Sequence, residues 1–150
     1  MKHEIYYHRN GNKVVPEALI EEVLAAIEEA VKCTSATSCR TKILGTLRDK
    51  KGWSNETRVS ADTNISITSK KQKTGLCLQT GNMSRFYADL LKLECLYNAG
   101  HIESAIYLLP DKALARKWGQ NIANYERFTA ELQIFQGIIH TPQVVIGIVE

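Results

Sequence analysis

The sequence lacks the features of membrane, secreted and repetitive proteins. Its longest apolar run, residues 144–149, is far too short to cross a bilayer. The first ten residues are polar and contain no apolar stretch of the kind that secretory signals carry. No internal repeat or low-complexity segment is present. These absences predict a soluble, cytoplasmic protein with no membrane segment.

Cysteine is also scarce. The chain has four cysteines, namely Cys33, Cys39, Cys77 and Cys95. No two of them form a C-x-x-C pair, which argues against a zinc site. Four cysteines in 150 residues are too few for a disulfide-dense mini-protein. We expect reduced thiols, most of them buried as small apolar groups.

The composition that remains is that of an ordinary globular protein. Hydrophobic residues make up 44% of the 150 residues and charged residues 23%. A chain of this length can bury a sizeable core and suffices for one domain of typical size. The sequence therefore predicts a single domain over residues 1–150.

The basic residues are concentrated in the middle of the chain. Nine lysines and arginines lie between Arg40 and Lys73 against three acids, an excess of six positive charges. The segment from Glu17 to Glu29 contains five acids and no base, and residues 74–150 are nearly balanced. A basic segment is typical of a surface that faces a polyanion, but solvated loops have the same composition.

The first third of the chain predicts a hairpin followed by a helix. Residues 4–15 hold two apolar runs on either side of Asn10-Gly11-Asn12, which favours a hairpin turn. Pro16 suits the first position of a helix. Apolar residues then follow at helical spacing, namely Leu19, Ile20, Val23, Leu24, Ile27 and Val31. We expect this helix to end near Cys33 and residues 40–53 to be irregular.

The rest of the chain predicts alternating strands and helices. Residues 64–68 and 76–79 favour a second hairpin, with Lys70, Lys71 and Lys73 at its tip. Asn82 or Ser84 caps the next helix, which the stop signal Asn98-Ala99-Gly100 ends. The later elements are strands at 105–109 and 144–149 and helical segments at 111–117 and 125–135. This order indicates an α/β domain.

The segment 74–93 carries a resemblance to a known family. Its strand ends Cys77-Leu78-Gln79, and its helix contains Asp89-Leu90. This segment resembles the type II restriction endonucleases of the BglII and BstYI kind, whose strand ends Glu-x-Gln before a helix with an Asp-Leu pair. Three further landmarks follow the same order, namely Cys39-Arg40-Thr41-Lys42, Lys51-Gly52-Trp53 and Val145-Ile146-Gly147-Ile148.

The resemblance implies a fold and partners. It implies the PD-(D/E)xK nuclease fold, a restriction-endonuclease-like core of a helix, a mixed β-sheet meander, a crossover helix and a strand. It also implies binding to double-stranded DNA and a two-fold homodimer formed through helices. An apolar edge of the acidic first helix is a candidate dimer surface.

The resemblance further implies Mg²⁺-dependent cleavage, for which this sequence lacks the acids. The family holds Mg²⁺ with an Asp and with the Glu of Glu-x-Gln, since Mg²⁺ prefers carboxylate and water oxygens. Gln79 is kept, but Cys77 stands at the Glu position and Thr68 at the Asp position. A thiol is a poor ligand for Mg²⁺. The nearest upstream acid is Asp62, a metal ligand only if the hairpin is longer than usual.

The resemblance and the charge suggest DNA contacts. Asn82 lies where the family's helix approaches the major groove, so it either pairs with a base edge or merely caps the helix. Arg85, one turn further, either reaches phosphate or a guanine edge or lies in solvent. The expected phosphate contacts are Arg40, Lys42, Lys70, Lys71 and Lys73.

Three functions follow, and the sequence leaves all three open. The first is a DNA-binding protein with impaired or lost Mg²⁺-dependent cleavage. The second is an active site-specific endodeoxyribonuclease whose rearranged site uses Asp62 and Gln79. The third is a protein-interaction module on the same scaffold, without enzymatic activity. Binding to a GATC-centred duplex, its salt dependence and its Mg²⁺-dependent cutting separate them.

Overall fold

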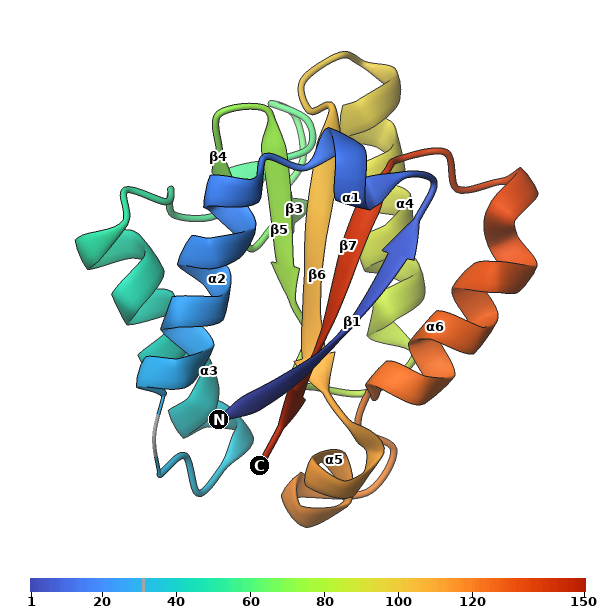
Figure 1. Cartoon of the computed structure of the whole chain (residues 1–150). Coiled ribbons are helices and arrows are strands. Elements are labelled where there is room, and N and C mark those ends of the chain that lie inside the picture. The colour runs from blue at the N-terminus through green and yellow to red at the C-terminus, as the bar shows by residue number, and fades with distance from the viewer. Residues whose placement is uncertain (31) are drawn as a thin grey trace.

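A five-stranded mixed sheet forms the centre of the computed structural model, which describes residues 1–30 and 32–150 (Figure 1). In spatial order its strands are β1 (Lys2–His8), β7 (Gln143–Val149), β6 (Ser104–Pro110), β5 (Thr74–Leu78) and β4 (Ser69–Lys71). The inner strands β5, β6 and β7 are parallel, and β4 and β1 are antiparallel to their neighbours. The predicted mixed α/β fold is therefore confirmed.

One face of the sheet is covered by the N-terminal helices. These are α2 (Glu17–Glu29), α3 (Ala36–Gly45) and the π-helical turn η1 (Thr46–Lys50). Leu19, Val23 and Ile27 recur every four residues on α2 and are buried against the sheet. Four of the acids of α2, namely Glu17, Glu21, Glu28 and Glu29, are exposed on its polar face, and Glu22 is half-buried.

The other face is covered by α4 (Arg85–Asn98) and α6 (Tyr125–Ile134), as Figure 1 shows. α4 connects β5 to β6, and the chain returns to β7 through α5 (Lys112–Trp118), α6 and η2 (Phe135–Gly137). Tyr107 on β6 stacks on Phe128 of α6 with ring centroids 4.2 Å apart. Each parallel pair of strands is thus joined by a helical crossover.

The hairpin predicted for residues 4–15 is wrong. β1 pairs with β7, the last strand of the chain, and Gly11 begins the short helix α1 (Gly11–Val14). Gly11 packs so closely that a Cβ there would lie 2.0 Å from the carbonyl oxygen of Gln143. A glycine is therefore needed here because it allows a close contact with β7, and not because it forms a hairpin turn.

The irregular stretch predicted for residues 40–53 is also wrong. α3 begins after Ser35, whose hydroxyl accepts a hydrogen bond from the Ser38 N–H at 3.1 Å, and η1 continues it to Lys50. Cys39, Ile43 and Leu47 recur every four residues and are fully buried. Basic and hydroxyl residues between them dilute the apolar pattern, which is why the sequence did not indicate a helix.

The second predicted hairpin exists, but with a different first strand. β4 pairs with β5 around a two-residue turn at Gln72 and Lys73, and Gln72 has a φ of 53°. Lys70 and Lys71 therefore lie on β4, and only Lys73 lies in the turn.

The expected strand at 64–68 forms a separate small sheet instead. β3 (Ser66–Ile67) pairs with β2 (Thr57–Arg58). Between β3 and β4 the hydroxyl of Thr68 accepts a hydrogen bond from the Leu78 N–H at 3.1 Å. A side chain replaces a backbone partner at this point, so the strand is interrupted at Thr68.

The later elements confirm their predictions. α4 ends at Asn98, as the stop signal predicted, and the Asp111 carboxylate caps α5 by accepting from the Leu114 N–H at 2.8 Å. The first predicted helix ends at Glu29, before Cys33, and its predicted residue Val31 lies outside the described residues. Among the described residues, no helix is long and apolar enough to span a membrane.

Candidate functional site

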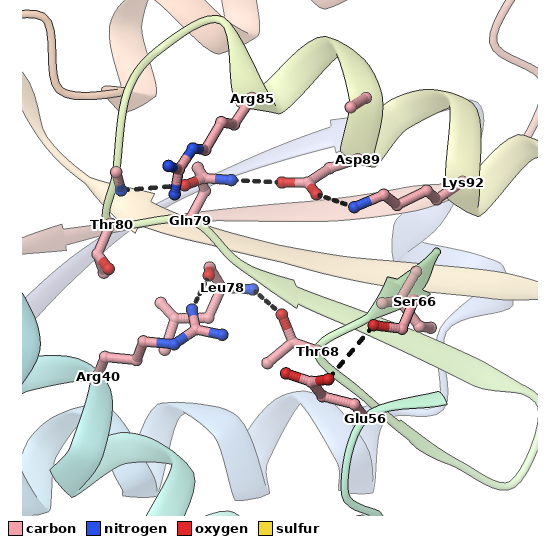
Figure 2. Close-up of a pocket in the computed structure, with 13 residues that line it drawn as sticks. Arg40, Glu56, Ser66, Thr68, Leu78, Gln79, Thr80, Arg85, Asp89 and Lys92 are labelled. Carbon is pink, nitrogen blue, oxygen red and sulfur yellow. Dashed lines mark hydrogen bonds and ion pairs between the residues drawn. The ribbon is translucent and has the colours of Figure 1, made fainter. Parts of the chain in front are cut away.

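A polar cleft of about 410 Å³ opens where β5 ends, between α3 and α4 (Figure 2). Its charged lining residues are Arg40, Glu56, Arg85, Asp89 and Lys92. Its neutral lining residues include Ser66, Thr68, Gln79, Thr80 and Gly81. Three basic side chains therefore face two acidic ones, and the cleft has a small positive excess.

Gln79 is held at the base of this cleft through both ends of its side-chain amide. Its Nε2 donates to Oδ2 of Asp89 at 2.7 Å, and its Oε1 accepts from the Gly81 N–H at 3.0 Å. The side chain is largely buried. The position of Gln79, which the sequence singled out, is thus fixed by contacts within the protein.

Asp89 is the centre of the polar contacts around Gln79. Besides Gln79, the buried Tyr107 hydroxyl donates to its Oδ2 at 2.7 Å, and Nζ of Lys92 lies 3.6 Å from its Oδ1. The sequence identified Asp89 only as part of the helix landmark. The Lys92 partner at i+3 on the same helix was the one local signal of its role.

Cys77 lies in the apolar core beneath α4 and does not line the cleft. Its side chain is 1% exposed. Burial raises the pKa of the Cys77 thiol well above its usual range, and the nearby negative charge of Asp89 raises it further. Cys77 therefore remains a neutral thiol, which is not a ligand for a hard cation.

Of the two other candidate positions for a metal ligand, Thr68 lies in the cleft and Asp62 does not. Thr68 lines the cleft, but it is a neutral residue whose hydroxyl already bonds to the Leu78 N–H. Asp62 lies in an exposed turn and is not among the residues that line the cleft. Glu56 is the acid that stands near Thr68, and its Oε2 accepts from the Ser66 hydroxyl at 3.4 Å (Figure 2).

These residues do not fit a Mg²⁺ ion. Within residues 1–30 and 32–150, no three His, Cys, Asp or Glu side chains cluster in a way that could hold a metal. The Asp89 carboxylate has an ammonium group and two hydrogen-bond donors around it. Mg²⁺ needs oxygen ligands in near-octahedral geometry, and cationic and N–H groups repel it.

Two arginines stand on either side of the loop that follows β5 (Figure 2). Nη1 of Arg40, on α3, donates to the carbonyl oxygen of Leu78. Arg85, at the start of α4, is exposed, and its guanidinium has no hydrogen bond or ion pair to any residue that the structure describes. Asn82 is exposed too, and its Oδ1 accepts from the N–H and hydroxyl of Ser84, each at 2.9 Å.

The four predicted lysines lie away from the cleft. Lys71 is half-buried, with its Nζ 2.8 Å from Oε1 of Glu22 and 2.6 Å from the Lys51 carbonyl oxygen. The Nζ of Lys73 donates to the Gly100 carbonyl at 2.9 Å. Lys42 is exposed on α3, and Lys70 is half-buried on β4. The basic segment is therefore dispersed over several surfaces, and among its residues, all of which the structure describes, Arg40 alone of the basic ones lines the cleft.

Comparison with known proteins places this fold. The family model described as restriction endonuclease BglII/BglIII matches residues 3–148. The crystal structure of restriction endonuclease BglII with a DNA 16-mer has a TM-score of 0.85 and 15% identity, covering 100% of this chain and 79% of that chain. Free BglII has a TM-score of 0.74 and 17% identity, covering 100% and 80%. No curated protein sequence matches.

Proposed function

This chain belongs to the restriction endonuclease BglII/BglIII family, and we propose that it binds double-stranded DNA and has little or no Mg²⁺-dependent cleavage activity. The structure with TM-score 0.85 is that of BglII complexed with a DNA 16-mer, which supports DNA as the ligand. The polar cleft beside β5, with its excess of basic groups, is the proposed position of one DNA strand.

The contacts of Asp89 carry the proposal that cleavage is impaired. Hydrolysis of a phosphodiester in this family would rely on Mg²⁺ held by carboxylates. The acid beside Gln79 is instead occupied by the Tyr107 hydroxyl and the Lys92 ammonium. Thr68 and the neutral Cys77 thiol stand at the two remaining positions, and neither supplies a carboxylate to a divalent cation.

We propose that the candidate residues differ in how much they contribute to DNA binding. Arg40 and Arg85 line the cleft, and Asn82 is exposed in the loop before α4, so these three would contact the nearest nucleotides. Lys42 and Lys70 would add weaker phosphate contacts. The remaining candidates, Lys71 and Lys73, are bonded within the fold and would contribute least.

We also propose that the protein forms a homodimer. An apolar groove of about 170 Å³ lies between α4 and the segment that follows α6. It is lined by Tyr87, Leu90, Leu91, Phe135, Ile138 and Ile139. Leu91 is 61% exposed and Ile138 is 66% exposed, and because both line the same groove they form part of one exposed apolar patch. This groove, and not the buried apolar edge of α2, is the proposed dimer surface.

A gel-shift titration tests the proposed function. A GATC-centred duplex and a scrambled duplex of the same length are titrated with the protein at low salt in Mg²⁺, and the bound DNA is then run on a denaturing gel. We expect a shifted duplex whose strands are intact, and tighter binding to the GATC-centred duplex would establish retained specific recognition. Raising the salt from about 50 to 200 mM should weaken binding steeply, because phosphate contacts release counterions.

Two outcomes would contradict the proposal. Failure of both duplexes to bind at micromolar protein would remove DNA as the ligand. Rapid cutting that Asp62→Ala abolishes would instead identify a working enzyme with a rearranged metal site. Asp49→Ala is the matched control, because Asp49 is an exposed acid in η1 that does not line the cleft.

A further inference from the structure

We infer that the cleft beside β5 holds a DNA phosphate without a divalent metal, through the guanidinium groups of Arg40 and Arg85. This inference rests on the proposed DNA binding and specifies how one phosphate is held.

The two guanidinium groups are arranged to receive one anion. Arg40 comes from α3 and Arg85 from α4, and they lie on opposite sides of the loop that begins at Gln79 (Figure 2). A guanidinium group has five N–H donors in a planar fork that matches a phosphate. Arg40 uses Nη1 on the Leu78 carbonyl, which orients the group. Arg85 has no such contact among the described residues and is available to a ligand.

The two acids of the cleft are outnumbered by its three cations. The charge of Asp89 is offset by Lys92 and by donors from Gln79 and Tyr107. Glu56 accepts a hydrogen bond from Ser66. A cleft of carboxylates would repel a phosphate until a cation entered, but here protein cations already exceed the acids. The positive charge that a metal would supply is therefore built into the side chains.

A divalent cation would gain little at this position. To reach Oδ1 of Asp89 it would have to displace the Lys92 ammonium, which lies 3.6 Å away. Mg²⁺ also loses its water ligands reluctantly. Metal-independent binding of the phosphate follows from this competition and distinguishes the cleft from a metal-assisted site.

Equilibrium binding to a fluorescent GATC-centred duplex tests the inference with the full chain. Fluorescence anisotropy is measured in EDTA, in Mg²⁺ and in Ca²⁺ at matched ionic strength. We expect the three dissociation constants of the wild type to agree within about twofold. Arg85→Gln and Arg40→Gln should each weaken binding about fivefold to tenfold and reduce the log–log salt slope by about one.

Arg9→Gln is the matched control. Arg9 is an exposed arginine that follows β1, at the opposite end of the sheet from the cleft, so its loss should leave the dissociation constant within about twofold. Circular dichroism checks that the variants are folded. Because Arg40 is half-buried, the exposed Arg85 decides the result if the Arg40 variant does not fold.

The outcomes separate this inference from the proposed function. Binding that rises more than tenfold with Mg²⁺ or Ca²⁺, or an Arg85 variant that binds like the Arg9 variant, overturns the inference and leaves DNA binding intact. Absence of wild-type binding in every buffer overturns both. Binding that is equal in all buffers and weakened by Arg85→Gln supports both.

Discussion

Asp89 lies twelve positions after Cys77 in the sequence and close to it in space. The contacts of its carboxylate determine the positions and charges of the neighbouring side chains. The carboxylate orients Gln79 and accepts from the buried Tyr107 hydroxyl. Because its negative charge lies close to the Cys77 thiol, it also opposes thiolate formation there. A carboxylate in this position acts as a structural hydrogen-bond acceptor.

Replacing Asp89 by alanine should lower the stability of the protein. The substitution leaves the Tyr107 hydroxyl and the Gln79 amide without their acceptor in a buried site, at a cost of about 2–4 kcal/mol in the free energy of unfolding. Urea denaturation measures this change. Tyr107→Phe, which removes one donor and leaves the carboxylate, should cost about 1–2 kcal/mol. An Asp89→Ala variant as stable as the wild type would mean that Asp89 serves to bind a ligand and does not stabilise the fold.

Because of the buried His8, we expect the stability of the protein to depend on pH. The ring is buried, and its Nε2 donates to the Ile139 carbonyl at 2.7 Å. Burial lowers the pKa of His8 below its ordinary value of 6.5; the hydrogen bond to Ile139 and the charge of Glu94 oppose this, and Arg9 and His140 reinforce it. The unfolded chain therefore binds the proton first, so stability is complete above pH 6.5 and falls as the pH decreases below that value.

The measurement is the urea midpoint at pH 7 and at pH 5. The wild type should lose stability over this interval, and His8→Gln, which keeps a donor to Ile139, should lose less. His3→Gln, at an exposed position on the same strand, is the control. Equal losses in the wild type and the His8 variant would show that His8 does not carry the effect.

At the scale of elements, Glu22 connects three segments of the N-terminal half. From α2 its carboxylate accepts from Nζ of Lys71 on β4 and, at 2.9 Å, from Nε1 of Trp53 in the loop after η1. Nζ of Lys71 also donates to the Lys51 carbonyl. These contacts fasten the edge strand β4 and the loop to α2. Lys71, expected as a phosphate contact, therefore has a structural position.

Lys71→Gln should change stability and leave DNA affinity nearly unchanged. Loss of a half-buried ion pair and a hydrogen bond should lower the free energy of unfolding by about 1–2 kcal/mol. The DNA dissociation constant should stay within about twofold of the wild type under conditions where the variant is folded. Lys70→Gln, on the same strand, is the control for stability. A variant that is as stable as the wild type but binds DNA more weakly would show that Lys71 contacts DNA.

How much of the fold could be predicted depended on how far apart in the sequence the contacting residues lie. α2, α4 and α6 were predictable because each has a strong apolar period and terminal signals within its own sequence. β1 was assigned to a local hairpin because its partner, β7, lies more than 130 residues away in the chain. α3 was missed because Cys39, Ile43 and Leu47 are separated by basic and hydroxyl residues.

The candidate site was predictable only along the motif. The resemblance to the family identified Gln79, Asn82 and Arg85 as candidates, and the resemblance and the charge also indicated Arg40. Glu56, Lys92 and Tyr107 come from separate elements, and no local pattern indicates that they meet. The site is assembled by the packing of α3 and α4 on either side of β5. The charge excess over residues 40–73 overestimated the basic surface, because several of those side chains bond within the fold.

At the scale of the whole molecule, α4 contributes to both proposed surfaces. Arg85 and Lys92 line the cleft, and Leu91 lines the apolar groove. A two-fold dimer that buries this groove would place the same helix of each subunit at the interface.

Leu91→Glu should therefore dissociate the dimer. A buried charge at the centre of an apolar interface is costly, so we expect the molar mass in solution to fall to that of one 16.9 kDa chain. Sedimentation equilibrium measures it. Ile65→Glu, at a residue that is 49% exposed and does not line the groove, is the control. A wild type that is already monomeric at about 100 μM would contradict the proposed dimer.

The central claim is that this member of the family binds DNA and leaves it uncut. The most direct measurement is a single-turnover reaction, with protein in excess over an end-labelled GATC-centred duplex in Mg²⁺. Native and denaturing gels of the same samples then report binding and cutting together. We expect a shifted duplex whose strands remain intact for hours. A shifted duplex that is cut within minutes, with cutting that EDTA stops, would contradict it.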